Sequence, residues 1–232
     1  MHGYGQFCPV AVACEVFAER WTPLILRELI LGARRFSDLR RGMPLISRAL
    51  LTQRLRYLED VGVIESRPVG RGREYRLSQA GEEFHGVIES LGIWGQRWIH
   101  GRASAENLDA QLLLWDIRRR LAVDQLPDRR VVVRFEFRGV PRGRGPATLW
   151  RVLSRQEVDA CDKDPGYGID LVVAADLAAL TRVWLGDVSF EAAVRARDIR
   201  VEGARELVRA FPRWLLRSHF ADVARPRSAR AS

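Results

Sequence analysis

Residues 34–67 read RRFSDLRRGMPLISRALLTQRLRYLEDVGVIESR, and this stretch decides the fold of the first half of the chain. Its opening predicts a short helix that Ser37 caps, and the Gly-Met-Pro sequence at residues 42–44 ends that helix. Ser47 then caps a second helix, which continues to about Glu59. Two short helices joined by a Gly/Pro turn are typical of a helix-turn-helix.

The second of these helices is expected to be amphipathic. Leu51, Leu55 and Leu58 recur at helical spacing and form its buried stripe. In a helix-turn-helix the second helix enters the major groove of DNA, where Gln and Arg bond two base-edge atoms at once, and a capped helix start suits a phosphate. The candidate DNA contacts in this motif are Ser37, Ser47, Arg48, Thr52, Gln53 and Arg56. The alternative is an ordinary solvated helix face.

Arg54 flanks the buried stripe, so two roles are open for it. It either contacts DNA or forms an ion pair with Glu59 or Glu28.

A β-hairpin is predicted directly after this helix. Residues 63–69 and 74–77 have strand character, and the glycine-rich tip between them carries Arg71 and Arg73. A hairpin in this position is the wing of a winged helix. Its two arginines are expected to reach the DNA backbone or minor groove, and the alternative is a solvated tip.

Further helices flank the winged helix. Residues 9–18 have helical spacing, and Thr22-Pro23 predicts a helix start with Thr22 as the cap; Gly32 ends this apolar helix. Ser78 is predicted to cap a helix with a long apolar and aromatic stripe, which is a candidate dimer surface. The stripe consists of Phe84, Val87, Ile88, Leu91, Trp94 and Trp98.

The composition limits the classes of protein. The chain of 232 residues has 38 Lys+Arg against 29 Asp+Glu, a net charge of +9, which favours a polyanionic partner. The surplus is +4 up to Arg102 and +5 beyond it, so it does not locate the binding surface. No apolar stretch of about 18 residues and no secretory signal are present. Three cysteines without a C-x-x-C pattern suit the reducing cytoplasm.

The second half is expected to be a separate α+β domain with helices over one sheet face. Residues 104–121 predict a helix that is partly a connector. Strands are predicted at 131–137, 148–154, 158–161, 169–174 and 199–202, and helices at 176–184, 189–196 and from 203 to Trp214.

The first half resembles the HxlR family of bacterial winged-helix regulators. The resemblance rests on CPVAVACEVFAERWTPLILREL, on residues 34–67 and on EYRLSQAGEEF…LGIWGQRW, and it extends to about Trp98. It implies a homodimer on an inverted-repeat operator, with the first helix and the helix after the wing building the dimer. Some members sense oxidants through an N-terminal cysteine, and Cys8 lies in the matching Cys-Pro. The alternative for Cys8 is a small buried hydrophobe.

The second half resembles the sterol carrier protein type two (SCP2) fold. DLVVAADLAALTRVWLGDVSFEAAVRARDIRVEGARELVRAFPRWL carries this resemblance, which implies an apolar tunnel for an acyl or sterol-like molecule. The pocket candidates are Phe135, Leu149, Val172, Trp184, Leu185, Phe190 and Trp214. The alternative is a packed domain without a cavity, in which all of these residues are core.

No catalytic constellation is visible, so an enzyme is not expected, and neither is a cofactor. His85 with Glu82 and Glu89 has ligand spacing on a helix, but such groups are more often solvated, and no metal is expected.

The expected organisation is a winged-helix domain at 1–102, a connecting helix at 103–120, a ligand-binding domain at 121–217 and a basic flexible tail at 218–232. The predicted function is a cytoplasmic, dimeric transcription regulator that binds double-stranded DNA and responds to an apolar ligand or to Cys8 oxidation. The alternative is an apolar-ligand carrier or assembly protein whose winged helix does not read DNA.

Overall fold

A computed structural model describes residues 3–99, 105–156, 158–161 and 164–225. The chain divides into two compact units, Met1–Ile93 and Trp94–Ser232, which are considered separately. The predicted boundary after Arg102 falls outside the described residues. No helix in the described ranges is long and apolar enough to cross a membrane.

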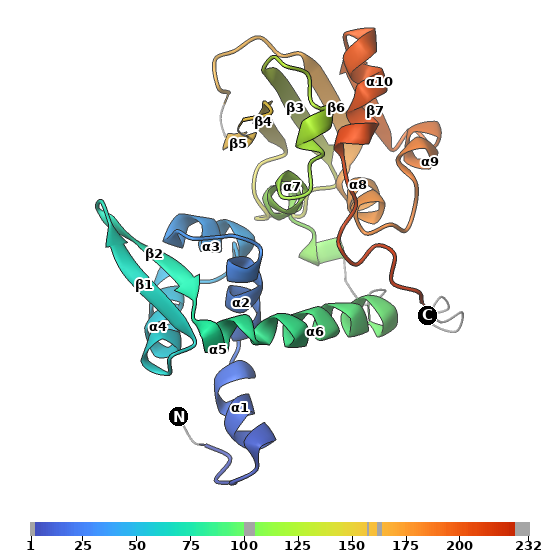
Figure 1. Ribbon diagram of the computed structural model, residues 1–232. Coiled ribbons are helices and arrows are strands. Elements are labelled where there is room, and N and C mark those ends of the chain that lie inside the picture. The colour runs from blue at the N-terminus through green and yellow to red at the C-terminus, as the bar shows by residue number, and fades with distance from the viewer. Residues whose placement is uncertain (1–2, 100–104, 157, 162–163, 226–232) are drawn as a thin grey trace. The chain divides into compact units, whose positions relative to one another are not determined.

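The first unit is a winged helix flanked by additional helices (Figure 1). Its elements are α1 (Pro9–Phe17), α2 (Thr22–Ile30), α3 (Phe36–Gly42), α4 (Arg48–Asp60), β1 (Ile64–Val69), β2 (Gly72–Leu77), α5 (Gln79–Glu82) and α6 (Phe84–Trp98), the last of which crosses the boundary between the units. The core lies among α2, α3, α4 and β1, and the predicted stripe of Leu51, Leu55 and Leu58 is buried. The predicted helix-turn-helix and wing are therefore confirmed.

The start of α3 differs from the prediction. Ser37 is not the cap: the helix begins at Phe36, with Arg35 at the N-cap position. Arg35 is held in an extended conformation by a β-bridge to Glu74 of the wing, so the helix starts as soon as this pairing ends. The Asp38 carboxylate accepts a hydrogen bond from the Arg35 backbone N–H at 3.4 Å, which satisfies one free amide.

The start of α2 also differs. Thr22 is the first helical residue rather than the cap, and Trp21 precedes it in the left-handed region at φ 79°. The Ile25 N–H bonds to the Trp21 carbonyl at 2.9 Å, which places the helix start one residue earlier than predicted. The Thr22 hydroxyl is buried and makes no hydrogen bond in the described part of the chain.

The single helix predicted after the wing is two helices. Ser78 is the cap, as predicted, and its hydroxyl accepts from the Gly81 N–H at 3.1 Å, but α5 ends at Glu82 and α6 begins at Phe84. A Cβ atom on Gly81 would lie 2.1 Å from the Val63 carbonyl oxygen. The close approach of α5 to the start of the wing therefore requires glycine.

The second unit is an α+β fold. Its elements are 3-10 turns at Ala105–Asn107 and Val123–Gln125, α7 (Ala110–Arg118), β3 (Val131–Arg138), β4 (Thr148–Leu153), β5 (Val158–Cys161), β6 (Leu171–Asp176), α8 (Leu177–Trp184), α9 (Phe190–Arg195), β7 (Ile199–Gly203) and α10 (Arg205–Trp214). All five predicted strands are present. The helix predicted at 104–121 is shorter, because Asp109 caps α7 by accepting from the Leu112 N–H at 2.9 Å; Ser104 lies outside the described residues.

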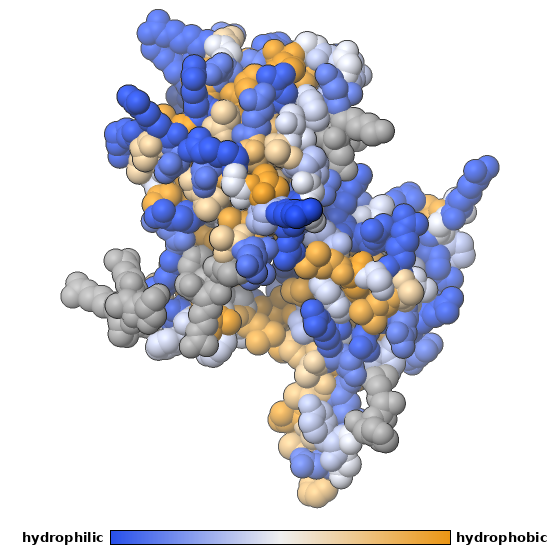
Figure 2. All heavy atoms as spheres, turned by 180° about the vertical axis from the view of Figure 1, so that it is seen from behind, coloured by the Kyte–Doolittle hydropathy of each residue, from blue (hydrophilic) through white to orange (hydrophobic). Residues whose placement is uncertain are grey.

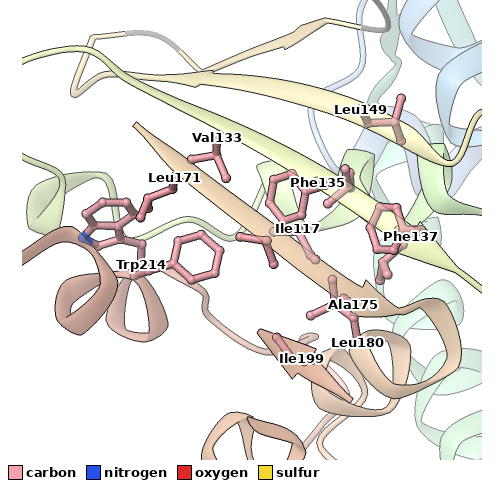
Figure 3. Close-up of a cluster of buried hydrophobic side chains, with 14 of the residues drawn as sticks. Ile117, Val133, Phe135, Phe137, Leu149, Leu171, Ala175, Leu180, Ile199 and Trp214 are labelled. Carbon is pink, nitrogen blue, oxygen red and sulfur yellow. The ribbon is translucent and has the colours of Figure 1, made fainter. Parts of the chain in front are cut away.

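The five strands form one sheet in the order β5-β4-β3-β6-β7. Only the β3–β6 pair is parallel among these neighbours. One sheet face packs against α7, α8, α9 and α10, as predicted, and Phe135, Leu171 and Trp214 lie in this core (Figure 3).

Part of the predicted tail contacts the second unit. The Ser218 N–H bonds to the Trp184 carbonyl at 2.8 Å, and Arg225 forms an ion pair with Asp187 at 2.5 Å. The tail from residue 226 onward lies outside the described residues.

Candidate nucleic-acid interface

The turn between α3 and α4 depends on a buried carboxylate. Glu28 is fully buried on α2, and Arg27 donates to its Oε1 at 2.7 Å and to the Gly42 carbonyl at 3.0 Å. A Cβ atom at position 42 would lie 1.8 Å from Glu28 Oε2. The turn therefore approaches the Glu28 carboxylate so closely that position 42 accommodates only glycine without a shift of the turn or of this side chain.

Three leucines anchor α4, and the opposite face of the helix is open to solvent. Ser47 caps the helix, because its hydroxyl accepts from the Leu50 N–H at 3.2 Å. Thr52 donates to the Arg48 carbonyl at 2.9 Å. The open face forms a shallow depression lined by Arg48, Ala49, Thr52, Gln53, Arg54, Arg56, Tyr57 and Asp60.

Three arginines of α4 and the wing have no counter-charge among the described residues. Arg48, Arg56 and Arg71 are exposed, and their side chains form no ion pair or hydrogen bond with another described residue. Gln53 is exposed and lines the same depression as Arg48 and Arg56. Unpaired guanidinium groups next to an exposed amide are the chemistry that contacts phosphates and base edges.

Arg54 is engaged within the unit. Its guanidinium forms an ion pair with Glu19 at 2.5 Å, and the arginine side chain is only 15% exposed. The expected partners, Glu59 and Glu28, are therefore wrong. Glu19 is 35 positions away in the loop between α1 and α2, and helical spacing carries no information about such a contact.

Two acids, Glu59 of α4 and Glu74 of β2, partly neutralise the arginines of the wing. Arg73 pairs with Glu59 at 3.0 Å and also donates from Nε to Ser66 at 2.8 Å. Arg67 pairs with Glu74 at 2.6 Å, and its hydrogen bond lowers the pKa of the Glu74 carboxyl. Both Arg71 and Arg73 were predicted to contact phosphate. The Arg73 side chain is bonded to Glu59 and Ser66, whereas the Arg71 side chain has no ion pair or hydrogen bond with another described residue.

The remaining predicted contact, Ser37, is exposed on α3. Tyr57 and Asp60, which are not among the predicted contacts, line the same depression as Gln53 and Arg56. They follow these residues at four-residue spacing, so helical periodicity was a signal that could have found them.

An apolar surface runs along α1 and α6. None of the residues of α1 is buried, and Phe17 at its end stacks on Phe84 at the start of α6, with ring centroids 5.3 Å apart. Hydrophobic side chains gather along both helices in Figure 2. Those that are exposed include Val10, Val12, Val87, Leu91, Trp94 and Trp98. Exposed apolar stripes of this kind are typical of protein interfaces.

Cys8 lies at the N-cap position of α1 and is exposed, so a buried hydrophobe is the wrong interpretation. The backbone N–H groups of Ala11 and Val10 lower the pKa of its thiol. Cys14 is half-buried. The side chain of Cys161 lies outside the described residues.

The seven predicted pocket residues do not line one cavity. Phe135, Leu149 and Trp214 lie in the packed core (Figure 3), and Phe135 borders a partly open cavity of about 10 Å³. Pockets for small molecules usually measure about 300–1,000 Å³. Val172 lies on the other sheet face, because Leu171 and Val173 point into the core.

The other three predicted pocket residues are half-buried: Trp184, Leu185 and Phe190. Of these, Phe190 lines a surface pocket of about 370 Å³, together with Val183 and Leu215.

His85 is exposed. Among the residues that the structure describes, no three His, Cys, Asp or Glu side chains are grouped so that they could hold a metal ion.

Comparison with known proteins identifies the family to which the first unit is similar. The model of the HxlR-like helix-turn-helix family matches residues 16–103. The HTH-type transcriptional regulator YtcD of Bacillus subtilis is 38% identical over 94 residues, which cover 39% of this chain and 75% of YtcD. The chain belongs to the HxlR-like helix-turn-helix family.

Other HxlR-like relatives are longer than the matched part. The HTH-type transcriptional regulator Rv3095 of Mycobacterium tuberculosis is 41% identical over 93 residues, or 39% of this chain, and the chain spans 58% of the length of that relative. The crystal structure of YtcD is similar over 38% of this chain and 94% of that chain, with 37% identity and a TM-score of 0.36. The family match ends at residue 103, which belongs to the second unit and lies outside the described residues.

Proposed function

We propose that this HxlR-like protein is a transcription regulator that binds double-stranded DNA. The observation that carries the proposal is the open face of α4, where Arg48, Gln53 and Arg56 are exposed and the two arginines lack partners among the described residues. Arg71 adds an exposed cation at the tip of the wing. In this arrangement α4 enters the major groove and Arg71 contacts the backbone or minor groove.

The proposed regulator acts as a homodimer on an inverted-repeat operator. The exposed stripe of α6, including Leu91 and Trp94, and the unburied helix α1 support this assembly. A two-fold dimer presents two α4 helices, and their separation must match half-sites about one DNA turn apart. A change in the dimer interface therefore changes the operator affinity.

Two signals are proposed to modulate the dimer. Oxidation of Cys8 is one, because the thiol is exposed and has a lowered pKa on the helix that belongs to the dimer surface. An apolar ligand in the second unit is the other, and it is proposed on the resemblance to the sterol carrier fold. The surface pocket beside Phe190 supports a ligand of this kind better than the 10 Å³ cavity beside Phe135 does.

A DNA retardation assay on the DNA upstream of the protein's own gene tests the proposal. We expect sequence-specific binding whose affinity falls steeply with salt, because phosphate contacts release counterions. Arg48→Ala and Arg56→Ala are expected to lose most of the binding, whereas Arg217→Ala is the matched control outside the winged helix. The lack of specific binding at any salt concentration favours the alternative, an apolar-ligand carrier.

A further inference from the structure

The sheet of the second unit has one face without a helical layer in the part of the chain that the structure describes. The described helices bury their apolar residues against Val133, Phe135, Leu171 and Val173. The residues that alternate with these lie on the opposite face, which we call the outer face. The outer face includes Val132, Arg134, Glu136, Trp150, Val152, Val172, Ala174, Arg200 and Glu202.

Two ion pairs define the charge pattern of the outer face. Arg134 and Glu136 pair along β3 at 2.8 Å, and their side chains are 33% and 43% exposed. Arg200 and Glu202 pair along β7 at 2.7 Å, and theirs are 76% and 53% exposed. All four charged groups therefore remain accessible.

The strand register arranges these four charges as a checkerboard. On β6, which lies between the two charged strands, Val172 is the partner of both Arg134 and Glu202. The next outer residue of β6, Ala174, is likewise the partner of both Glu136 and Arg200. One row across the face therefore reads positive, apolar, negative, and the next row reads negative, apolar, positive.

A checkerboard of this kind is complementary to itself. Two copies packed face to face are related by a two-fold axis in the plane of the interface. If the axis runs across the strands, Arg134 faces Glu136 of the other copy. If the axis runs along β6, Arg134 faces Glu202 of the other copy. In both orientations, each of the four charged side chains faces a side chain of the other sign in the second copy.

The apolar residues of the outer face fit the same partner. Val172 and Ala174 separate the two charged strands and are half-buried, and Trp150 is adjacent to Arg134 on β4. The indole N–H of Trp150 is buried without a hydrogen bond to another described residue. We propose that the outer face binds the outer face of a second copy of this chain, with Val172 and Ala174 at the centre and the charges around them.

Mixing two charge-reversed variants tests this interface in the full-length protein. Arg134→Glu and Glu136→Arg each place like charges opposite one another across a two-fold axis that crosses the strands. We expect each variant alone to associate beyond the α6-based dimer about tenfold more weakly than the wild-type protein. An equimolar mixture restores the association, because the acid introduced at position 134 of one chain then faces the base introduced at position 136 of the other. For an axis along β6, the rescuing mixture is instead Arg134→Glu with Glu202→Arg.

The mixture distinguishes ion pairs between two chains from ion pairs within a single chain. Both variants lack the ion pair along their own β3, so an intramolecular role cannot be rescued by mixing. Sedimentation velocity, with one variant fluorescently labelled at its N-terminus, measures the cross-association, and thermal unfolding verifies that each variant is folded. Arg217→Glu mixed with Asp222→Arg is the control, because this exposed pair, 2.7 Å apart, lies outside the sheet.

The proposed interface is overturned when neither mixture shows more cross-association than the control mixture. It is also overturned when the single variants associate beyond the α6-based dimer as strongly as the wild-type protein. Neither measurement involves DNA, so the proposed regulator function and this interface are tested independently.

Discussion

Arg54 of α4 and Glu19, in the loop between α1 and α2, form an ion pair of 2.5 Å. Glu19 follows a helix that buries none of its residues and that carries part of the exposed apolar surface. The pair therefore connects the helix proposed to read DNA with the segment proposed to form the dimer. A shift of α1 in the dimer is expected to change the position of α4 through this contact.

Removal of Arg54 is expected to affect stability as well as DNA binding. Arg54→Gln leaves the partly buried Glu19 without its counter-charge, which costs about 1–2 kcal/mol of unfolding free energy. Urea unfolding measures this cost. The charge swap Glu19→Arg with Arg54→Glu is expected to recover most of it, whereas Arg48→Gln, on the open side of the same helix, unfolds like the wild-type protein. Equal stability of Arg54→Gln and Arg48→Gln contradicts the assignment.

The three arginines without partners among the described residues are expected to act through phosphate or base contacts. Arg48→Ala, Arg56→Ala and Arg71→Ala are predicted to change the unfolding free energy by less than about 0.5 kcal/mol. For each of these arginines that contacts a phosphate, its replacement by alanine reduces the magnitude of the slope of log affinity against log salt by about 1. Retardation assays at several salt concentrations measure this slope. For Arg73→Ala a loss of stability is expected too, because Arg73 also bonds Glu59 and Ser66.

Gly42 is expected to be intolerant of substitution. In Gly42→Ala the new Cβ atom meets the buried carboxylate of Glu28, so either the turn or the Glu28 side chain, which is paired with Arg27, must move. We expect a loss of about 2–4 kcal/mol, measured by chemical or thermal unfolding. The control is Gly86→Ala, because a Cβ there meets nothing within 4 Å and the residue lies within α6. That control is predicted to gain about 0.5–1 kcal/mol, and destabilisation in both variants points to a cause other than the Glu28 contact.

Cys8 is expected to be the more reactive of the two described cysteines. Because the helix N–H groups lower its pKa, the Cys8 thiolate is populated at lower pH than an ordinary thiolate, so its alkylation rate rises earlier as the pH increases. Iodoacetamide labelling between about pH 6 and 9, with mass spectrometry of the peptides, measures both cysteines. Cys8 is predicted to react faster than the half-buried Cys14. The unfolded protein supplies the reference, and identical pH profiles for folded and unfolded Cys8 exclude the effect.

The exposed stripe of α6 is expected to control dimerisation. Leu91→Glu introduces a charge into this apolar surface, and because Leu91 is 46% exposed its replacement leaves the fold of the unit intact. In an Arg134→Glu background, which weakens association through the outer sheet face, sedimentation velocity is expected to show at least a roughly tenfold weaker dimer. His85→Glu, an exposed position on another side of the same helix, is the control. An unchanged dimer in Leu91→Glu means that α6 does not form the interface.

Local patterns were sufficient to predict most elements. Ser47, Ser78 and Asp176 are caps in the structure because a side-chain oxygen reaches an N–H three residues ahead, which is a short-range contact. The leucine stripe of α4 and the alternation along β3 follow from the helical and strand periods. These signals predicted the winged helix, the order of the second unit and the outward face of α4.

Only the tertiary structure decided which polar groups are engaged. The partner of Arg54 is 35 positions away, and the engagement of Arg73 depends on how the wing folds back to Glu59. The need for Gly42 is equally invisible in its local sequence, because it arises from the buried Glu28 on another helix.

The sequence by itself determined most helices and strands, the winged helix and the residues that α4 exposes, because caps and periodicity act over a few neighbouring residues. The tertiary structure decided which of these side chains remain free, that Val172 lies outside the core, and that the cavity beside Phe135 measures only about 10 Å³. The reason is physical: ion pairs, sheet register and packing depend on atoms that distant segments bring together.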